Sequence, residues 1–127
     1  MEYTIGEVSK KLDMSTYTLR FYEKEGLLPS IKRNQQGIRK FNEDNLYWID
    51  MVRCFRDTGM SLQDVKHIVD LTNEGHDTLE ERKHILQEHK AKVQQQMDNL
   101  QQHLHKIDKK IQWYEGDTTA CEIQSRV

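Results

Sequence analysis

Cysteine and proline are scarce in this chain of 127 residues, which has two cysteines and one proline. Two cysteines far apart in the sequence cannot form the disulfide framework of a small secreted domain, and an iron–sulfur cluster would need four. Long apolar runs are also missing, and the first residues do not have the pattern of a secretory leader. We therefore expect a soluble, cytoplasmic protein with thiols at rest and no membrane partner.

Apolar residues make up only 35% of the sequence, and its mean hydropathy is -0.90. These values are low for a compact globule. They indicate long, solvent-exposed helices or a core that a partner chain completes. The length fits one small domain, alone or with an extension.

Enzyme motifs are missing as well. The sequence has no phosphate loop, nucleophile elbow or metal-hydrolase motif. A lone cysteine without a base assigned to it is insufficient for catalysis. His84, Glu88 and His89 lack the ligand spacing of a zinc site, so a polar surface is the preferred interpretation. We expect neither enzyme activity nor a cofactor nor a bound metal.

The net charge of -2 hides an uneven distribution. Residues 1–40 have eight lysines and arginines against five acids, a net charge of +3. The remaining residues have eleven bases against sixteen acids, a net charge of -5. Because a polyanion is bound by local rather than total charge, the basic N-terminal segment predicts a confined polyanion-binding face.

Helix start and stop signals divide the chain into five predicted helices. Capping boxes, in which a hydroxyl and a carboxylate three residues apart satisfy backbone N–H groups, are expected at Thr4 with Glu7, Ser61 with Asp64 and Thr78 with Glu81. Glycines that can end a helix in the left-handed conformation are Gly26, Gly59, Gly75 and Gly116. The predicted helices span residues 5–12, 15–24, 42–58, 61–72 and 78–115.

The first two predicted helices are short and are joined by the tight link Asp13-Met14, which is the outline of a helix-turn-helix. Pro29 then stops helix continuation, and residues 31–33 and 38–41 can pair as short strands. This hairpin contains no acid and four bases, namely Lys32, Arg33, Arg39 and Lys40. A helix for the major groove beside a basic hairpin for the flanking backbone predicts a winged helix-turn-helix.

The second predicted helix contains TYTLRFYEKEGL, whose phenols, hydroxyls and guanidinium are groups that hold phosphate oxygens and base edges. The candidate DNA contacts here are Ser15, Tyr17, Thr18, Arg20 and Tyr22. The alternative is that Phe21 and one tyrosine belong to the core and the rest is ordinary surface. The adjoining basic hairpin favours DNA binding.

Residues 78–115 contain neither proline nor glycine, and their apolar residues follow a heptad pattern. The predicted dimerisation residues are Leu86, Val93, Leu100 and Ile107 of one seam, which Leu79 and Tyr114 extend, and Met97, Leu104 and Ile111 of the other. A helix of about 57 Å is too long to be buried against one small domain, so it predicts a coiled coil with a second copy. Arg82, His89 and Lys90 lie on or beside the start of the seam, so we expect the first turns to contact the N-terminal domain.

Several motifs together resemble the MerR family of transcriptional regulators. They are TIGEVSKKLDMSTYTLRFYEKEGLL, then GIRKF, then a helix that ends in DTGMSL, then the long helix. The resemblance implies a mainly α-helical fold: a winged helix-turn-helix domain in residues 1–75 with its wing at about 29–41, a dimerisation helix in 76–116 that forms an antiparallel coiled coil, and a short tail in 117–127. It also implies three partners, which are double-stranded promoter DNA, a second copy of the chain as a homodimer and, indirectly, RNA polymerase.

Matching the motifs position by position also implies roles for single residues. The resemblance assigns DNA contacts to Ser15, Tyr17, Arg20 and Tyr22 in the second helix, Arg33 and Arg39 in the wing, and Arg56 in the third helix. The family often has tyrosines where this chain has Ile38 and Phe41. Packing rather than hydroxyl contacts is therefore expected at these two positions.

Cys54 lies between two arginines near the end of the third predicted helix, in MVRCFRDTGM. A single cysteine here is similar to the NmlR and AdhR subgroup, which implies a stress response to aldehydes, other electrophiles or redox change through this thiol. A helical wheel places Cys54 at the edge of an apolar face made by Tyr47, Trp48, Met51, Val52 and Phe55. Cysteine at an edge is either a reachable thiol or a small buried hydrophobe.

Alternatives remain open for the signal and for the class of protein. The regulator could sense a metal or small molecule, held between coiled coil and DNA-binding domain, independently of Cys54. The chain could instead be a coiled-coil adaptor that binds protein and uses its hairpin only for solubility. A disulfide between Cys54 and Cys121 of the tail is conceivable in an antiparallel dimer but is not favoured.

Overall fold

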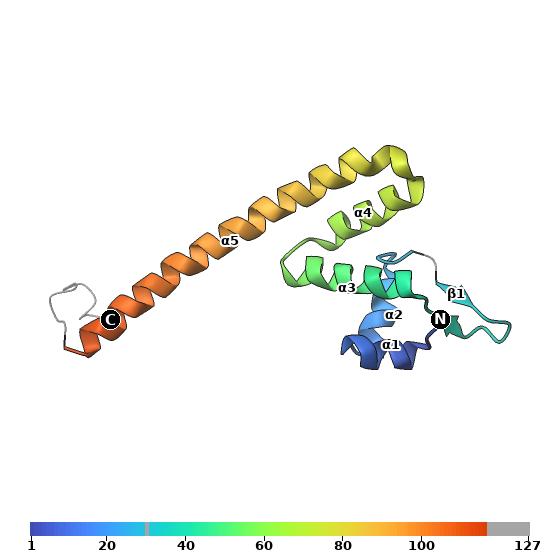
Figure 1. Cartoon of the computed structure of the whole chain (residues 1–127), viewed down its shortest axis with the longest axis horizontal. Coiled ribbons are helices and arrows are strands. Elements are labelled where there is room, and N and C mark those ends of the chain that lie inside the picture. Colours follow the sequence, from blue (N-terminus) through green and yellow to red (C-terminus); the bar gives the residue numbers. More distant parts are fainter. Residues whose placement is uncertain (30, 117–127) are drawn as a thin grey trace. The chain divides into compact units, whose positions relative to one another are not determined.

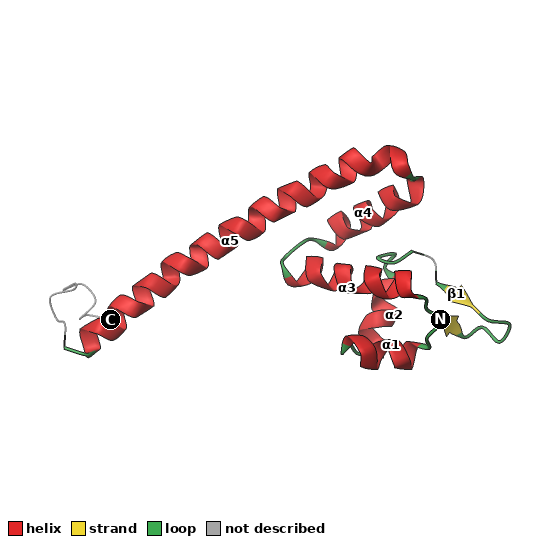
Figure 2. Ribbon diagram, viewed as in Figure 1, coloured by secondary structure: helices red, strands yellow, loops and turns green. Residues whose placement is uncertain are grey.

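The computed structural model describes residues 1–29 and 31–116 and is mainly helical (Figures 1 and 2). In chain order its elements are α1 (Ile5–Leu12), α2 (Thr16–Lys24), β1 (Lys32–Arg33), β2 (Arg39–Lys40), α3 (Glu43–Asp57), α4 (Leu62–Glu74), the 3-10 helix η1 (His76–Thr78) and α5 (Leu79–Tyr114). The predicted fold of a helix-turn-helix, a wing and a long C-terminal helix is confirmed. The predicted tail of 117–127, with Cys121, lies outside the described residues.

Local hydrogen bonds build the tight link between α1 and α2. Thr4 and Glu7 form the predicted capping box at the start of α1. α1 ends at Asp13, which has a φ of 53°, a left-handed conformation that aspartate tolerates better than most residues. Ser15 then caps α2 by accepting a hydrogen bond from the Thr18 N–H. Only three residues separate the two helices, and this short link restricts how α2 can be oriented relative to α1.

The caps of the later helices differ in part from the prediction. Of the predicted capping box of Ser61 with Asp64, one half is present, in which the Ser61 hydroxyl accepts a hydrogen bond from the Asp64 N–H. The predicted capping box of Thr78 with Glu81 is wrong, because the Thr78 hydroxyl donates to the backbone carbonyls of Leu71 and Gly75. That hydroxyl therefore ties η1 to the end of α4, which runs two residues further than predicted.

The wing is a short antiparallel hairpin of β1 and β2. Lys32 pairs with Lys40, and Arg33 pairs with Arg39. The Asn34 side chain closes the turn by accepting two hydrogen bonds from backbone N–H groups, at 2.9 and 3.0 Å. The register places like charges directly opposite each other in both pairs, an arrangement that destabilises a hairpin unless another group compensates.

Phe41 fastens the wing to the rest of the N-terminal domain. Its backbone exchanges hydrogen bonds of 2.7 and 2.9 Å with Tyr3, which adds the chain start to the hairpin. The Phe41 side chain is only 2% exposed. The Tyr3 hydroxyl donates to the Glu43 carboxylate, and this hydrogen bond raises the pKa of Tyr3. The expected packing role of Phe41 is therefore confirmed, whereas that of Ile38 is wrong, because its side chain is 52% exposed.

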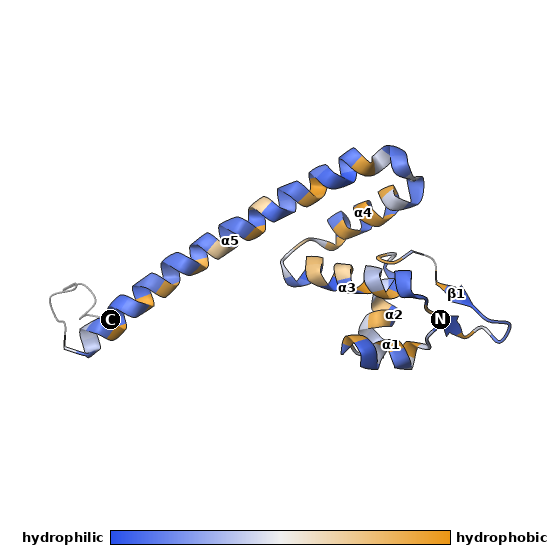
Figure 3. Cartoon of the chain, in the orientation of Figure 1, coloured by the Kyte–Doolittle hydropathy of each residue, from blue (hydrophilic) through white to orange (hydrophobic). Residues whose placement is uncertain are grey.

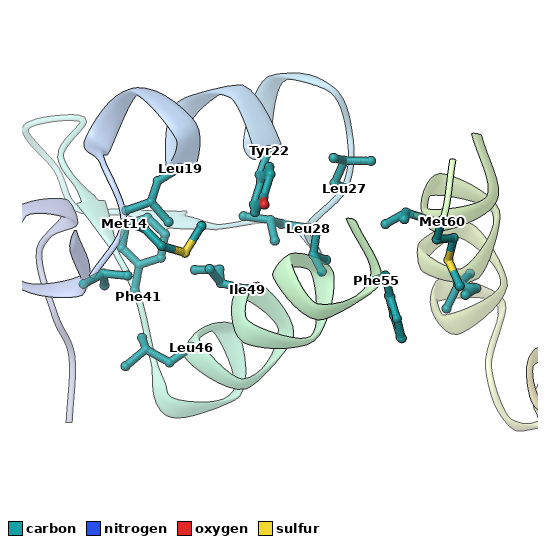
Figure 4. Close-up of a cluster of buried hydrophobic side chains, with 14 of the residues drawn as sticks. Met14, Leu19, Tyr22, Leu27, Leu28, Phe41, Leu46, Ile49, Phe55 and Met60 are labelled. Atoms are coloured by element: carbon teal, nitrogen blue, oxygen red, sulfur yellow. The ribbon is translucent and has the colours of Figure 1, made fainter. Parts of the chain in front are cut away.

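One cluster of buried side chains holds the helices of this domain together. Figure 4 shows Leu19 and Tyr22 pointing from α2 toward Ile49 on α3. Val65 and Ile68 of α4 belong to the same cluster. Because α2 buries one face against α3, its opposite face is left for solvent.

α3 buries the predicted apolar face except for Tyr47, since Val52 and Phe55 are buried and Trp48 and Met51 pack against the core. Its buried residues are Asn45, Leu46, Ile49, Val52 and Phe55. Tyr47, which the helical wheel placed on the apolar face, is 67% exposed. Cys54 is exposed as well and lies on the same outward side, two helical turns after Tyr47. Of the two possibilities left open for Cys54, the structure shows the exposed thiol and not the small buried hydrophobe.

The described chain forms two compact units, and their boundary falls within α5. The first unit is Met1–Gln87, and the second begins at Glu88. Ile85 packs against the core of the first unit. Arg82 donates hydrogen bonds to the Gly75 carbonyl at 3.1 Å and to the Thr78 hydroxyl at 3.0 Å. The expectation that the first turns of the long helix contact the N-terminal domain is confirmed.

The rest of α5 displays its apolar residues to solvent. α5 has no buried residue along its 36 residues, and Figure 3 shows apolar bands recurring along it. Five seam residues are between 48% and 67% exposed, namely Met97, Leu100, Leu104, Ile107 and Ile111. Leu86 is 38% exposed, and Val93 is half-buried. A periodic apolar stripe of this kind is typical of a helix that pairs with another helix.

Replacement of Phe41 tests how the wing is fastened. We expect Phe41→Ala to lower the free energy of unfolding by about 3 to 5 kcal/mol, because it leaves a cavity in the core. Ile38→Ala is the matched control on the same hairpin, and its exposed side chain predicts a change within about 0.5 kcal/mol. Urea unfolding followed by circular dichroism measures both. Equal effects of the two substitutions would contradict this assignment.

Candidate nucleic-acid interface

The outward face of α2 gathers residues that suit nucleic acid. Tyr17, Arg20, Phe21 and Lys24 follow a helical period of three to four residues, and all four are exposed. Tyr17 is 77% exposed, and the Arg20 guanidinium donates a hydrogen bond of 3.3 Å to the Thr16 hydroxyl. A guanidinium can reach base edges and phosphates, and an aromatic ring can contact a thymine methyl or a sugar. Phe21 and Lys24 are additions to the predicted set.

Ser15 and Thr18 lie at the N-terminus of α2. Their hydroxyl oxygens are 2.8 Å apart, and the Ser15 oxygen accepts the Thr18 N–H. Ser15 is exposed, and Thr18 is half-buried. Helix N-termini favour phosphate because their N–H groups and dipole present positive charge. Ser15 is therefore the cap of α2 and Thr18 is its partner, and both positions are compatible with the predicted approach to the groove.

Tyr22 lies in the core rather than on the outward face of α2. It is 7% exposed and belongs to the buried cluster, so its ring packs against protein. Burial and the nearby Asp57 carboxylate raise the pKa of Tyr22, and the phenol is therefore neutral and able to donate. Any DNA contact of Tyr22 would have to come from its hydroxyl. The predicted core pair of Phe21 and one tyrosine is thus half right: Tyr22 is buried, and Phe21 is 36% exposed.

Glu23 joins the wing arginines to α2. Its carboxylate oxygen accepts a hydrogen bond of 2.6 Å from the Arg39 Nε. The same oxygen lies 3.6 Å from an Arg33 Nη. The other Nη of Arg33 donates to the Gly37 carbonyl of the wing turn at 2.9 Å. The structure thus brings the two predicted wing arginines together around an acid that is absent from the predicted set of site residues.

Two arginines of α3 bind backbone carbonyls of neighbouring elements. Arg53 donates to the Leu12 carbonyl at the end of α1 and to the Asp50 carboxylate at 2.7 Å. Arg56 donates to the Met60 carbonyl of the turn before α4 at 2.6 Å. Arg56 is exposed, so its guanidinium has further N–H groups open to solvent, and its contact with a DNA phosphate stays a prediction.

Other kinds of site find no support in the described ranges. Within residues 1–29 and 31–116, no three His, Cys, Asp or Glu side chains gather in a way that could hold a metal ion. None of the helices described there combines the length and the apolar character of a membrane span.

The fold and this surface define a DNA-binding protein of the winged helix-turn-helix class. Residues 3–72 match the family described as MerR HTH family regulatory protein, and residues 46–110 match the one described as MerR, DNA binding. An uncharacterised HTH-type transcriptional regulator of Haemophilus influenzae is 38% identical over 115 residues, which cover 91% of this chain and 85% of that protein. The HTH-type transcriptional regulator AdhR of Bacillus subtilis is 36% identical over 89 residues, which cover 70% of this chain and 64% of AdhR.

Solved structures agree with these relatives. The structure of HiNmlR, described as a MerR family regulator lacking the sensor domain and bound to promoter DNA, has a TM-score of 0.84 at 37% identity and 94% coverage of both chains. The chain belongs to the MerR family of transcriptional regulators, and it matches AdhR and HiNmlR of the predicted subgroup. Since the relatives are named as regulators, the chain is a DNA-binding regulator and not an enzyme.

Arg20 is the first residue of the α2 face to test. We expect Arg20→Ala to weaken binding to a cognate duplex, selected from a random pool by the wild-type protein, by about 1 to 3 kcal/mol, because the guanidinium no longer reaches a base or phosphate. Lys92→Ala is the control, since it removes one positive charge from α5. Fluorescence anisotropy titrations compare the three proteins. Wild-type affinity in Arg20→Ala would show that α2 does not read DNA through this residue.

Proposed function

We propose that the chain is a homodimeric regulator that binds promoter DNA through α2 and the wing and responds to aldehydes or other electrophiles through Cys54. The observation that carries the sensing part is the exposed position of Cys54 on α3, between two arginines that hold neighbouring elements. RNA polymerase is affected indirectly, through the shape of the promoter.

Support for promoter binding comes from charge and geometry. Arg20 and Lys24 lie on the exposed face of α2, and the wing beside it has four bases. Such positive charge close to a groove-sized helix provides most of the attraction to a duplex. HiNmlR, to which this chain is similar over 94% of its length, is described as bound to promoter DNA.

The apolar stripe of α5 supports the homodimer. Burial of seven seam side chains in a coiled coil would contribute on the order of 10 kcal/mol, at about 1 to 2 kcal/mol for each partly exposed residue. A second copy is the simplest partner because it offers the same stripe, and an antiparallel pair matches the family pattern implied by the motifs. The 36 residues of α5 give about five heptads for this contact.

Exposure of Cys54 makes a direct reaction possible. A thiolate attacks the carbonyl carbon of an aldehyde, so a carbon–sulfur bond forms as the C=O π bond opens, and the oxygen then takes a proton from water, which leaves as hydroxide. The product is a hemithioacetal on the outward side of α3. HiNmlR is described as lacking a sensor domain, which favours a signal that is read within the shared part of the fold.

The neighbours of Cys54 provide a route from this reaction to DNA. Arg53 connects the same turn of α3 to the Leu12 carbonyl in the helix-turn-helix. Arg56 connects it to the Met60 carbonyl before α4. An adduct that shifts this turn of α3 would move both connections, and with them α1 and the start of α4. A reaction at one surface thiol would thus change the geometry of the DNA-binding elements.

Leu100 tests the homodimer. We expect Leu100→Glu to raise the dimer dissociation constant by at least about 100-fold, because a carboxylate would be buried in the seam without a partner. Gln102→Glu introduces the same charge two residues later, at the outermost heptad position, and should leave the dimer intact. Sedimentation equilibrium gives the mass of each protein in solution. A monomeric wild-type protein, or a dimeric Leu100→Glu, would contradict the proposal.

Cys54→Ser tests the sensor. We expect wild-type protein to change promoter transcription in vitro when formaldehyde is added, and Cys54→Ser to bind the promoter without this response. Peptide mass spectrometry should show Cys54 protected from iodoacetamide by the aldehyde, whereas Cys121→Ser should respond like the wild type. An unchanged response in Cys54→Ser would instead favour a metal or small-molecule signal that does not involve this thiol.

A further inference from the structure

The wing contains two pairs of like charges, and Glu23 compensates the charge of one of these pairs. Arg33 lies directly opposite Arg39, and Lys32 lies opposite Lys40. Like charges opposite each other destabilise an antiparallel pair. Side chains alternate in direction along a strand, so the arginine pair and the lysine pair point to opposite faces of the hairpin. Glu23 of α2 is bound to the arginine pair.

The contacts of this carboxylate leave the arginines able to bind a second anion. The Arg39 Nε donates a hydrogen bond of 2.6 Å to the Glu23 carboxylate. A guanidinium has five N–H donors in a fixed plane, so one carboxylate oxygen does not exhaust them. The side chains of Arg39 and Arg33 are 24% and 46% exposed. Both guanidinium groups are therefore oriented by protein and open to solvent at the same time.

We propose that Glu23 is a positioning residue for DNA binding, which holds Arg39 and Arg33 in the orientation that contacts phosphate. This inference rests on the proposed role of the wing arginines as DNA contacts. Glu23 acts through them and does not itself touch DNA. Its position in α2 also ties the wing to the helix that enters the groove, so the two parts meet the duplex as one surface.

The energetic basis is the side-chain entropy of arginine. A free arginine has many rotamers and must lose most of them when it binds a phosphate. Arginines already fixed by a carboxylate lose fewer on binding, so more of the contact energy becomes affinity. The same logic explains why a charged residue next to an arginine strengthens its binding to a second anion when it fixes the guanidinium plane.

Whether Glu23→Gln strengthens or weakens DNA binding distinguishes a positioning role of Glu23 from simple charge repulsion. Glu23 carries a negative charge beside a surface that binds a polyanion. If its charge acted only through repulsion, Glu23→Gln would bind DNA more tightly. Positioning predicts the opposite, a weaker complex in spite of one less negative charge. Glu25→Gln, at the C-cap two residues later, removes the same charge from the same end of α2 and measures the electrostatic part.

The experiment measures binding of a duplex selected by the wild-type protein, across a range of salt concentrations. We expect Glu23→Gln to bind about threefold to tenfold more weakly than wild type. The slope of log K against log salt should fall in magnitude by about 0.9 for each phosphate that the variant no longer neutralises. Glu25→Gln should bind as well as the wild type or slightly better, with an unchanged slope.

A double-mutant cycle with Arg39→Gln completes the test. If Glu23 acts through Arg39, Glu23→Gln should change affinity by less than about twofold in the Arg39→Gln background. A general loss of stability would weaken binding in both backgrounds, so it cannot produce this pattern, and thermal melts verify that each protein is folded.

Two results would overturn the inference in different ways. If Arg39→Gln weakens binding but Glu23→Gln does not, or if the two effects add, Glu23 has no positioning role and the wing contacts stand. If Arg39→Gln binds like the wild type, the proposed wing contact itself is wrong, and the role of Glu23 falls with it.

Discussion

The packing of α2 against α3 is the interaction on which the DNA-binding surface depends. Leu19 and Tyr22 point inward to Ile49, and the period of the helix then turns Tyr17 and Arg20 outward. Without that buried pair, a nine-residue helix would be marginal in water, since short isolated helices rarely hold. The residues that bury α2 are thus as necessary for recognition as those that face DNA, although they contribute no contact to it.

Much of this architecture could be predicted from the sequence, because its signals are local. The capping box of Thr4 with Glu7 depends on residues three apart, and it forms as predicted. The predictions that were wrong concern residues whose partners come close only through tertiary packing. The Thr78 hydroxyl donates to the Leu71 carbonyl of α4 and does not form the capping box, because that carbonyl is close only in the folded chain. Tyr47 is exposed against the prediction for a similar reason, since a helical wheel does not show which neighbouring elements cover a helix.

The residues of the candidate site also differ in whether local sequence patterns could identify them. Exposed positions such as Tyr17 and Arg20 follow from helix period and side-chain chemistry, and they lie where the sequence predicts. Glu23 could not be identified in this way, because its partners lie ten and sixteen residues later in the chain. A strand register that places Arg33 opposite Arg39 offers the one available signal. Two facing cations destabilise a hairpin and are stabilised by a nearby acid, and the helix before the wing is one source of such an acid.

α3 connects the parts that a regulator must couple. Its inner face contributes Ile49 and Val52 to the core, and its outer face presents Cys54. Arg53, next to Cys54, reaches the end of α1. A rigid element that is packed on one side and accessible on the other can transmit a surface event only by moving as a body, because close-packed interiors deform little. Contacts at its ends would then change together. In the proposed response, the energy of that movement would come from the difference in stability of the two arrangements when Cys54 is modified and when it is not.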